Sequence, residues 1–166
     1  MVVLGNLQTD EQLTTSTRSP TPSLHTIFVQ AAIAAATSRC VFTFDVGQAF
    51  LNAQLDTVGS EDVILQLSKQ TAKILLELDP SYTKFLRPDG TMRVRLNKAL
   101  YGLREAPMIW FDTVKAFFIM YRFKQSTLNE CLFYKRYSDG SSIDVLLHVD
   151  DGKGTTDTPE RARHML

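Results

Sequence analysis

The feature that most constrains this chain is an apolar segment, residues 143–147, that runs directly into two adjacent aspartates. Its Ile, Val and Leu content is typical of a buried strand. Adjacent carboxylates at the end of a buried strand repel each other and lose hydration, so they need a compensating cation, usually a metal ion. A hairpin turn that uses Asp and Gly for their backbone preferences explains the same residues. At this point both interpretations stay open for the four residues concerned, His148, Val149, Asp150 and Asp151.

A second acid ends a second strand-like segment far upstream. Residues 40–44 are β-branched and aromatic, which indicates a buried strand, and Asp45 closes it. Gly47 follows and permits close approach of the backbone. Two divalent ions about 4 Å apart, held by such acids, can activate a 3′-hydroxyl and stabilise a pyrophosphate leaving group. We therefore expect Asp45 to hold divalent metal together with Asp150 and Asp151.

The periodicity along the chain predicts an α+β fold, a small antiparallel sheet packed on helices. We expect a strand at residues 62–67, a second at 92–96, and a hairpin of 132–134 with 145–147; residues 152–156 read as a poor strand. Helices are expected near residues 24–35, 72–78, 107–122 and from 159 onward. The predicted apolar stripes are Leu24, Ile27, Phe28, Ala31 and Ala35 on the first helix, and Trp110, Val114, Phe117 and Tyr121 on the third.

Composition and charge exclude some classes of function. Hydrophobic residues make up 44% of the 166, enough for a core, and the net charge is zero, which argues against a protein that mainly coats nucleic acid. Acids predominate in residues 45–79 and bases in 84–104. An acidic metal site beside a phosphate-facing surface has this pattern, and so does chance segregation of a solvated surface.

The cysteines and the chain ends carry further expectations. Cys40 and Cys131 lack metal-ligand spacing, and a disulfide framework is not expected, which fits a reducing compartment. The uncharged residues 19–38 are too short in their apolar part to span a bilayer, so no membrane partner is expected. Residues 2–4 read as the tail of a strand, and residues 161–166 stop inside a helical pattern. We expect a fragment of a longer polyprotein.

Four segments, in order, resemble motifs of the Ty1/copia-type reverse transcriptases. Residues 44–52 resemble the first catalytic motif of that family. Residues 96–107, with Trp110 and Phe111 after them, look like its Leu-Tyr-Gly-Leu-Lys-Gln-Ser-Pro…Trp-Tyr motif. Residues 129–133 resemble the segment before the catalytic hairpin, and residues 149–151 match its Val-Asp-Asp core. The likeness covers the chain from about residue 4 to the end.

The resemblance implies the palm and partial fingers of a right-hand polymerase across residues 1–166, without the thumb, the RNase H domain or the upstream fingers segment. It implies an RNA-directed DNA polymerase that adds deoxynucleotides to a primer 3′-end. Two Mg²⁺ ions, or Mn²⁺, would be carried by Asp45, Asp150 and Asp151, with the Val46 carbonyl as an added ligand. The nucleotide would contact Gly47, Gln48, Ala49, Phe50, Tyr101 and Gly102. The template–primer would contact Lys98, Arg104, His148 and Val149.

Several of these residues have simpler interpretations. Phe50 would lie under the sugar of the nucleotide and reject a 2′-hydroxyl, but its residue type alone indicates a core aromatic. Gly102 also fits a plain turn, and Lys98 and Arg104 fit solvated bases. His148 stands where the family has Tyr; it keeps a ring and a hydrogen-bonding group, and a role as a metal ligand is the other interpretation.

The implied partners are an RNA or DNA template–primer, deoxynucleotides and the rest of a Pol polyprotein, including integrase and RNase H. The implied location is a cytoplasmic virus-like particle, with a later nuclear step. The first alternative is an inactive remnant that folds, or binds nucleic acid or a partner, without polymerising. The second is an unrelated two-metal phosphohydrolase, which would need more ligands than His25, His148 and His164 supply.

Overall fold

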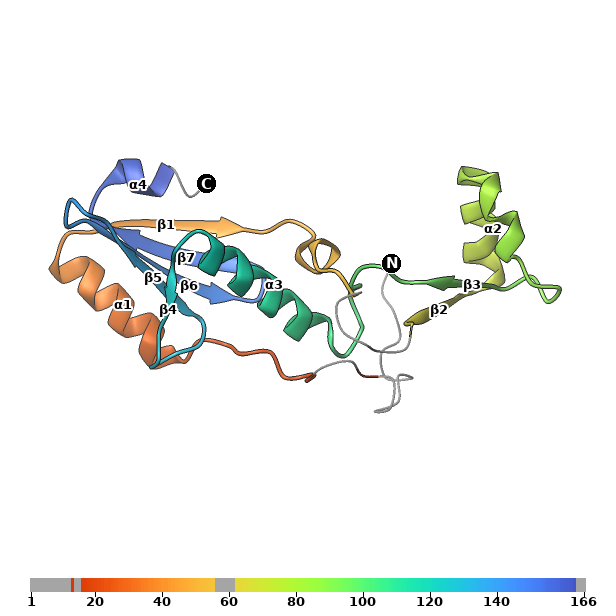
Figure 1. The fold of residues 1–166 in the computed structure, drawn as a ribbon, viewed down its shortest axis with the longest axis horizontal. Helices are drawn as coiled ribbons and strands as arrows, with labels where there is room; N and C mark the ends of the chain where they lie inside the picture. The colour runs from red at the N-terminus through yellow and green to blue at the C-terminus, as the bar shows by residue number, and fades with distance from the viewer. Residues whose placement is uncertain (1–12, 14–15, 56–61, 164–166) are drawn as a thin grey trace.

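A computed structural model describes residues 13, 16–55 and 62–163 of the chain. Helices and antiparallel sheets alternate along it, which confirms the predicted α+β class (Figure 1). The helices are α1 (Leu24–Ala36), α2 (Lys69–Leu78), α3 (Ala106–Met120) and α4 (Pro159–Arg163), with 3₁₀ turns η3 (Ala49–Asn52) and η4 (Pro80–Phe85). The strands are β1 (Cys40–Asp45), β2 (Ile64–Leu67), β3 (Met92–Arg95), β4 (Lys124–Gln125), β5 (Leu132–Arg136), β6 (Ser142–His148) and β7 (Asp151–Thr156).

The main sheet has five strands in the order β1-β7-β6-β5-β4, and each neighbouring pair is antiparallel. The predicted hairpin is confirmed as β5 and β6. A second hairpin, β6 and β7, then places β7 against β1, although about a hundred residues separate the two in sequence. The end of β1 therefore lies beside the β6–β7 turn, and this pairing is what brings the distant acids to one edge.

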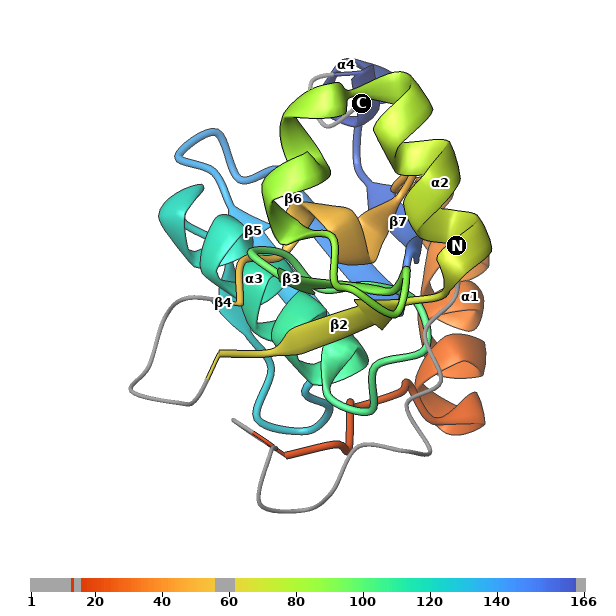
Figure 2. The same ribbon diagram turned by 90° about the vertical axis from the view of Figure 1, so that its right-hand side faces the viewer.

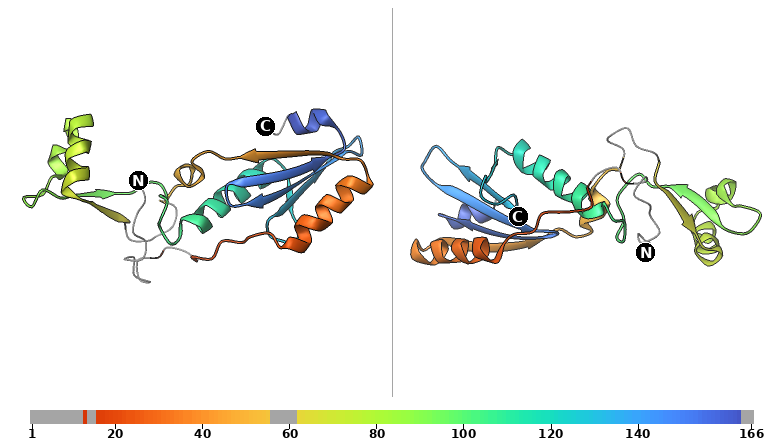
Figure 3. Two further views of the ribbon diagram at one scale, coloured as in Figure 1. Left: turned by 180° about the vertical axis from the view of Figure 1, so that it is seen from behind. Right: turned by 90° about the horizontal axis from the view of Figure 1, so that it is seen from below.

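The two faces of the main sheet are covered by different helices (Figure 3). On one face α3 packs Trp110, Val114 and Phe118 into the main core, where Phe118 stacks on Phe133 with ring centroids 4.9 Å apart. On the other face lies α1, whose Ile27 belongs to a smaller cluster with the buried Leu146.

Strand β7 corrects the expectation of a poor strand at residues 152–156. Gly152 and Gly154 are paired with Phe44 and Phe42 on β1, and a Cβ atom at either glycine would overlap the facing ring. The missing side chains make room for the two aromatic rings, so the glycines serve the packing of this strand pair. Strand propensity alone was misleading because the cross-strand partner decides the fit.

The predicted apolar stripes were partly wrong. In α3 the buried positions include 110, 114 and 118, whereas Phe117 and Tyr121 are exposed. In α1 the buried residues are Gln30 and Ala34, and Phe28 is 66% exposed. Both helices are apolar nearly all round, so the sequence offers no polar face from which to infer the buried one.

A smaller unit lies at the far end of the molecule from the main sheet (Figures 1 and 2). Strands β2 and β3 pair there, and α2 packs on them through a small core of Leu67, Ala72 and Met92. The Ser68 hydroxyl accepts a hydrogen bond from the Thr71 N–H and caps the start of α2. This helix begins earlier than predicted because of that cap.

Three further expectations concern the cysteines, the membrane and the chain ends. Cys40 and Cys131 are free thiols. Within the described residues, none of the helices combines the length and apolarity that crossing a membrane requires. The strand tail expected at residues 2–4, like the last three residues of the chain, lies outside the described residues.

Candidate active site

Three strand positions converge at one edge of the main sheet. Asp45, the last residue of β1, is the register partner of Asp151, the first residue of β7. Asp151 is also the register partner of His148, the last residue of β6. Side chains directly opposite in an antiparallel pair share a face, with Cβ atoms about 5 Å apart. Asp45, Asp151 and His148 therefore form one row across three strands.

Asp150 enters from the turn between β6 and β7. The Val46 N–H donates a hydrogen bond to the Asp150 carbonyl oxygen at 2.9 Å, which ties the residue after Asp45 to this turn. All three predicted aspartates are thus brought to the same edge by backbone pairing. The turn interpretation and the site interpretation are compatible, because the turn itself carries the acids.

The turn is held by a residue whose role the sequence did not reveal. Val149 has a φ of +60°, a left-handed conformation that is costly for a β-branched residue. The Trp110 indole Nε1 donates a hydrogen bond of 2.7 Å to the Val149 carbonyl oxygen. Trp110 is otherwise buried in the main core. A buried indole N–H needs a hydrogen-bond acceptor. That requirement is the signal in the sequence that could have indicated a contact of this kind for Trp110.

The chemistry of the acids fits a divalent cation that is shared with substrate. Carboxylate oxygens are hard ligands suited to Mg²⁺ and Mn²⁺. Among the described residues no group of three or more His, Cys, Asp or Glu side chains is placed to hold a metal ion. Mg²⁺ is commonly bound by one or two carboxylates together with substrate phosphates rather than by a closed protein cage.

The residues predicted to contact a nucleotide lie beyond the end of β1. Gln48 adopts a left-handed φ of +56° and starts the 3₁₀ turn that contains Ala49 and Phe50. Phe50 is only 9% exposed, and its ring centroid lies 4.6 Å from that of Tyr101. Gly102, beside Tyr101, has a φ of +99°, which favours glycine. The first two motifs therefore meet through an aromatic pair.

The two predicted template bases are both exposed. Lys98 forms an isolated bridge with Gln54, in the connection between β3 and α3. Arg104 lies in the turn just before α3. Their contact with template phosphates stays a prediction.

A cavity of about 440 Å³ adjoins the row of acids. It extends from that row along the sheet face covered by α1, and its lining residues include Asp45, His148, Asp151, Lys153, Pro22 and Ile27. Ligand pockets commonly have volumes of this order. The cavity lining combines the charged residues of that row with apolar residues such as Ile27 of α1.

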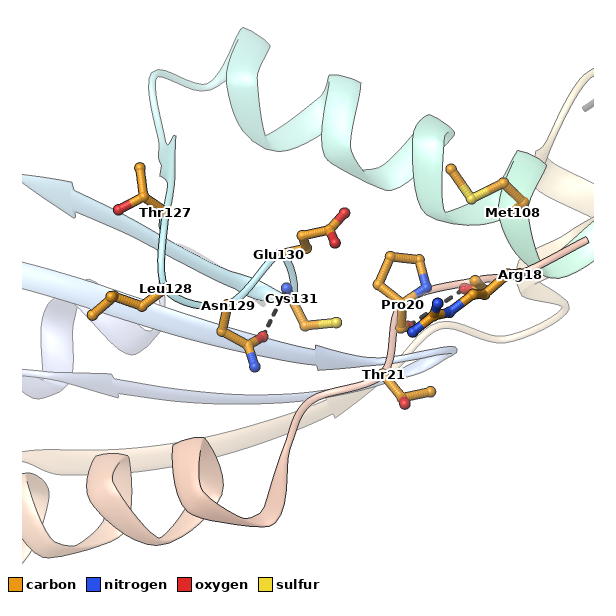
Figure 4. A pocket seen from close by; sticks show the side chains of 10 residues that line it. Arg18, Pro20, Thr21, Met108, Thr127, Leu128, Asn129, Glu130 and Cys131 are labelled. Carbon is orange, nitrogen blue, oxygen red and sulfur yellow. Dashed lines mark hydrogen bonds between the residues drawn. The ribbon is translucent and has the colours of Figure 1, made fainter. Parts of the chain in front are cut away.

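A second cavity of about 510 Å³ lies between residues 18–21, the start of α3 and the β4–β5 loop (Figure 4). It contains no paired acids. At its base the Asn129 side chain accepts a hydrogen bond of 2.9 Å from the Cys131 N–H. Burial raises the pKa of the Cys131 thiol to about 11, with a smaller contribution from the charge of Glu130. A thiol with such a pKa is a poor nucleophile.

The site is thus a sheet edge that carries converging acids and is tied to a helix that follows a Tyr-Gly turn. The family described as reverse transcriptase (RNA-dependent DNA polymerase) matches residues 1–156. The chain belongs to this family of RNA-directed DNA polymerases, which confirms the resemblance drawn from the motifs.

Two curated relatives are Pol polyproteins of plant transposons. The retrovirus-related Pol polyprotein from transposon TNT 1-94 of Nicotiana tabacum is 37% identical over 60 residues, 36% of this chain and 4% of that protein. The one from transposon RE2 of Arabidopsis thaliana is 27% identical over 135 residues, 81% of this chain and 8% of that protein. The chain thus spans less than a tenth of the length of either relative. No solved structure is a significant match.

Proposed function

We propose that this chain is the palm and partial fingers of a reverse transcriptase that adds deoxynucleotides to a primer 3′-end on an RNA template. The observation that carries the proposal is the register of β1 with β7, which sets Asp45 opposite Asp151 and joins Val46 to Asp150. In this assignment the main sheet with α3 is the palm, and the β2–β3 unit belongs to the fingers.

In the proposed reaction the aspartates hold two Mg²⁺ ions, which supply activation of the 3′-hydroxyl and stabilisation of the leaving pyrophosphate. Asp45 and Asp150 are the essential pair, and the Val46 carbonyl adds a ligand. Phe50, supported by Tyr101, lies under the sugar of the nucleotide and excludes a 2′-hydroxyl. Lys98 and Arg104 contact template phosphates, and His148 and Val149 face the primer end.

We further propose that the chain acts within a Pol polyprotein that includes integrase and RNase H, in a cytoplasmic virus-like particle with a later nuclear step. The support is the match to two transposon Pol polyproteins.

Primer extension on an RNA template with the purified chain tests this function. We expect Mg²⁺-dependent extension, and a loss of at least about 100-fold in rate for Asp45→Asn or Asp150→Asn, which remove charge with little change in shape. Asp112→Asn, at an exposed position on α3, is the matched control and should keep the wild-type rate.

The main alternative is a remnant that binds template–primer without polymerising. His148, which replaces the family's Tyr beside the acids, favours it. Wild-type extension no faster than that of Asp150→Asn, with template–primer binding retained, would establish this alternative and reject the polymerase assignment.

A further inference from the structure

The sheet face covered by α1 carries a regular grid of side chains. The first row is Asp45, Asp151 and His148, and strand alternation makes the second row Thr43, Lys153 and Leu146. The third row contains Thr155 and Asp144, and the Thr155 hydroxyl donates a hydrogen bond of 3.2 Å to the Asp144 carboxylate. That bond supports the assignment of these strand positions to one face.

A cation beside the third row, Arg39, uses all of its hydrogen-bond donors within the protein. Arg39 pairs with Asp144 at 3.2 Å and Asp157 at 2.7 Å, and it also donates to Thr155 and Ser142. Its side chain is only 9% exposed. Arg39 therefore joins the α1–β1 turn to β6 and β7, and it has no capacity left for a ligand.

The second row also carries a cation, and its situation is different. Lys153 is half-buried and lines the cavity that adjoins the acids. Within the described part of the chain its ammonium group forms no ion pair or hydrogen bond, even though the first-row carboxylates Asp45 and Asp151 lie one row away. An ammonium group that lines a cavity without a protein partner is well placed to bind an anionic ligand.

The position of Lys153 separates it from the proposed nucleotide site. Phe50 and Tyr101 lie beyond the end of β1, on one side of the row of acids. Lys153 lies on the other side, two residues further along β7. A strand whose 3′-end reaches the acids from the Lys153 side would bring one backbone phosphate beside Lys153, in the cavity that adjoins the first row. An incoming triphosphate would instead lie on the Phe50 side.

We infer that Lys153 binds a backbone phosphate of the primer strand close to its 3′-end, with the adjoining cavity receiving the terminal nucleotide. The inference rests on the proposed function and adds a positioning residue to it. Lysine is a compact charge that can approach a single phosphate oxygen.

Fluorescence anisotropy with a labelled DNA primer on an RNA template, in EDTA and over a salt series, tests the contact without catalysis. Lys153→Gln should weaken binding about five- to tenfold near 0.1 M salt and reduce the slope of log affinity against log salt by about one. Lys153→Arg should restore most of the affinity. Lys124→Gln, on the exposed far edge of the same sheet, is the matched control and should leave the slope unchanged.

Steady-state extension with Mg²⁺ distinguishes the primer from the nucleotide as ligand. Lys153→Gln should raise the KM for template–primer and leave the KM for the deoxynucleotide within about twofold, because only the primer contact is lost. A raised nucleotide KM with an unchanged primer KM would assign Lys153 to the triphosphate and overturn the inference. Thermal melting of each variant verifies that the fold is retained.

The outcomes separate the two proposals. If extension is lost in Asp150→Asn but unchanged in Lys153→Gln, and Lys153→Gln also binds template–primer normally, the polymerase assignment stands and the Lys153 contact is rejected. Binding that depends on Lys153 without any extension keeps the contact and rejects polymerisation. Absence of both binding and extension in the wild-type chain rejects both.

Discussion

The Trp110 indole Nε1 donates a hydrogen bond of 2.7 Å to the carbonyl oxygen of Val149. Trp110 lies on α3, directly after the Tyr-Gly segment, and Val149 forms the turn that presents Asp150. Two motifs about forty residues apart in sequence are therefore joined by one side chain. The position of the acids depends on α3 as well as on the strands that carry them.

Trp110→Phe should loosen the acid-bearing turn while keeping an aromatic ring in the core. The Val149 carbonyl loses its donor, and its left-handed backbone loses a restraint. We expect a loss of about 1–3 kcal/mol in the free energy of unfolding, measured with urea, and a larger loss of extension rate than stability alone explains. Phe118→Leu, on the same helix, should lower stability without changing the rate per folded molecule; equal rate losses in both variants would contradict a specific role for Trp110.

Phe50→Val should relax discrimination against ribonucleotides. The Phe50 ring is fixed by its contact with Tyr101, so a smaller side chain leaves space where a 2′-hydroxyl would clash. The ratio of kcat/KM for deoxynucleotide to that for ribonucleotide should fall at least about tenfold. Tyr101→Phe, which keeps the ring pair, should leave the ratio unchanged. An unaltered ratio in Phe50→Val would return Phe50 to a purely structural role.

Arg39→Ala should destabilise the main sheet. The substitution leaves Asp144 and Asp157 without their cation and removes four further hydrogen bonds to Thr155 and Ser142. Because both acids are about one-third exposed, water screens part of the penalty, and we expect a loss of about 2–3 kcal/mol. Arg136→Ala, at the exposed end of β5, should change the free energy of unfolding, measured with urea, by less than about 0.5 kcal/mol. Similar losses in both would show that Arg39 is not a fixed link.

Gly154→Ala should destabilise through overlap with Phe42, the residue opposite it on β1. We expect a loss of about 1–3 kcal/mol. In Phe42→Ala the ring is gone, so adding Gly154→Ala should then cost little. The double-mutant cycle gives the coupling energy directly, and additive effects would mean that the glycine is needed for another reason.

The two thiols should react at very different rates. A pKa of about 11 leaves roughly one in a thousand Cys131 thiols ionised at pH 8, and the side chain is also buried. Native protein treated with a thiol-disulfide reagent should show one fast thiol, and urea should expose the second. Cys40→Ser should remove the fast phase. Persistence of that phase in Cys40→Ser would show that the Cys131 region opens readily.

Much of the fold could be predicted from local pattern. The hairpin of β5 and β6, strand β1 ending at Asp45, and helix α3 starting near Pro107 follow from residue types and spacing. The buried face of α1 did not, because Leu24 and Phe28 are as apolar as the residues that face the sheet, and only tertiary contacts select Gln30 and Ala34. Strand β7 could not be predicted either, because glycine has low strand propensity. Gly152 and Gly154 fit the strand only because the rings of Phe44 and Phe42 lie opposite them.

For the site, the sequence by itself predicted which residues would carry the chemistry and determined which family the chain resembles, because motif order and residue type are local properties. It also placed acids at the ends of two strands. Only the tertiary structure decided that Asp45 faces Asp151, that Trp110 holds the turn, and that Lys153 lines the same cavity as the acids. Those relationships depend on which strands become neighbours, and strand pairing is set by long-range packing rather than by local sequence.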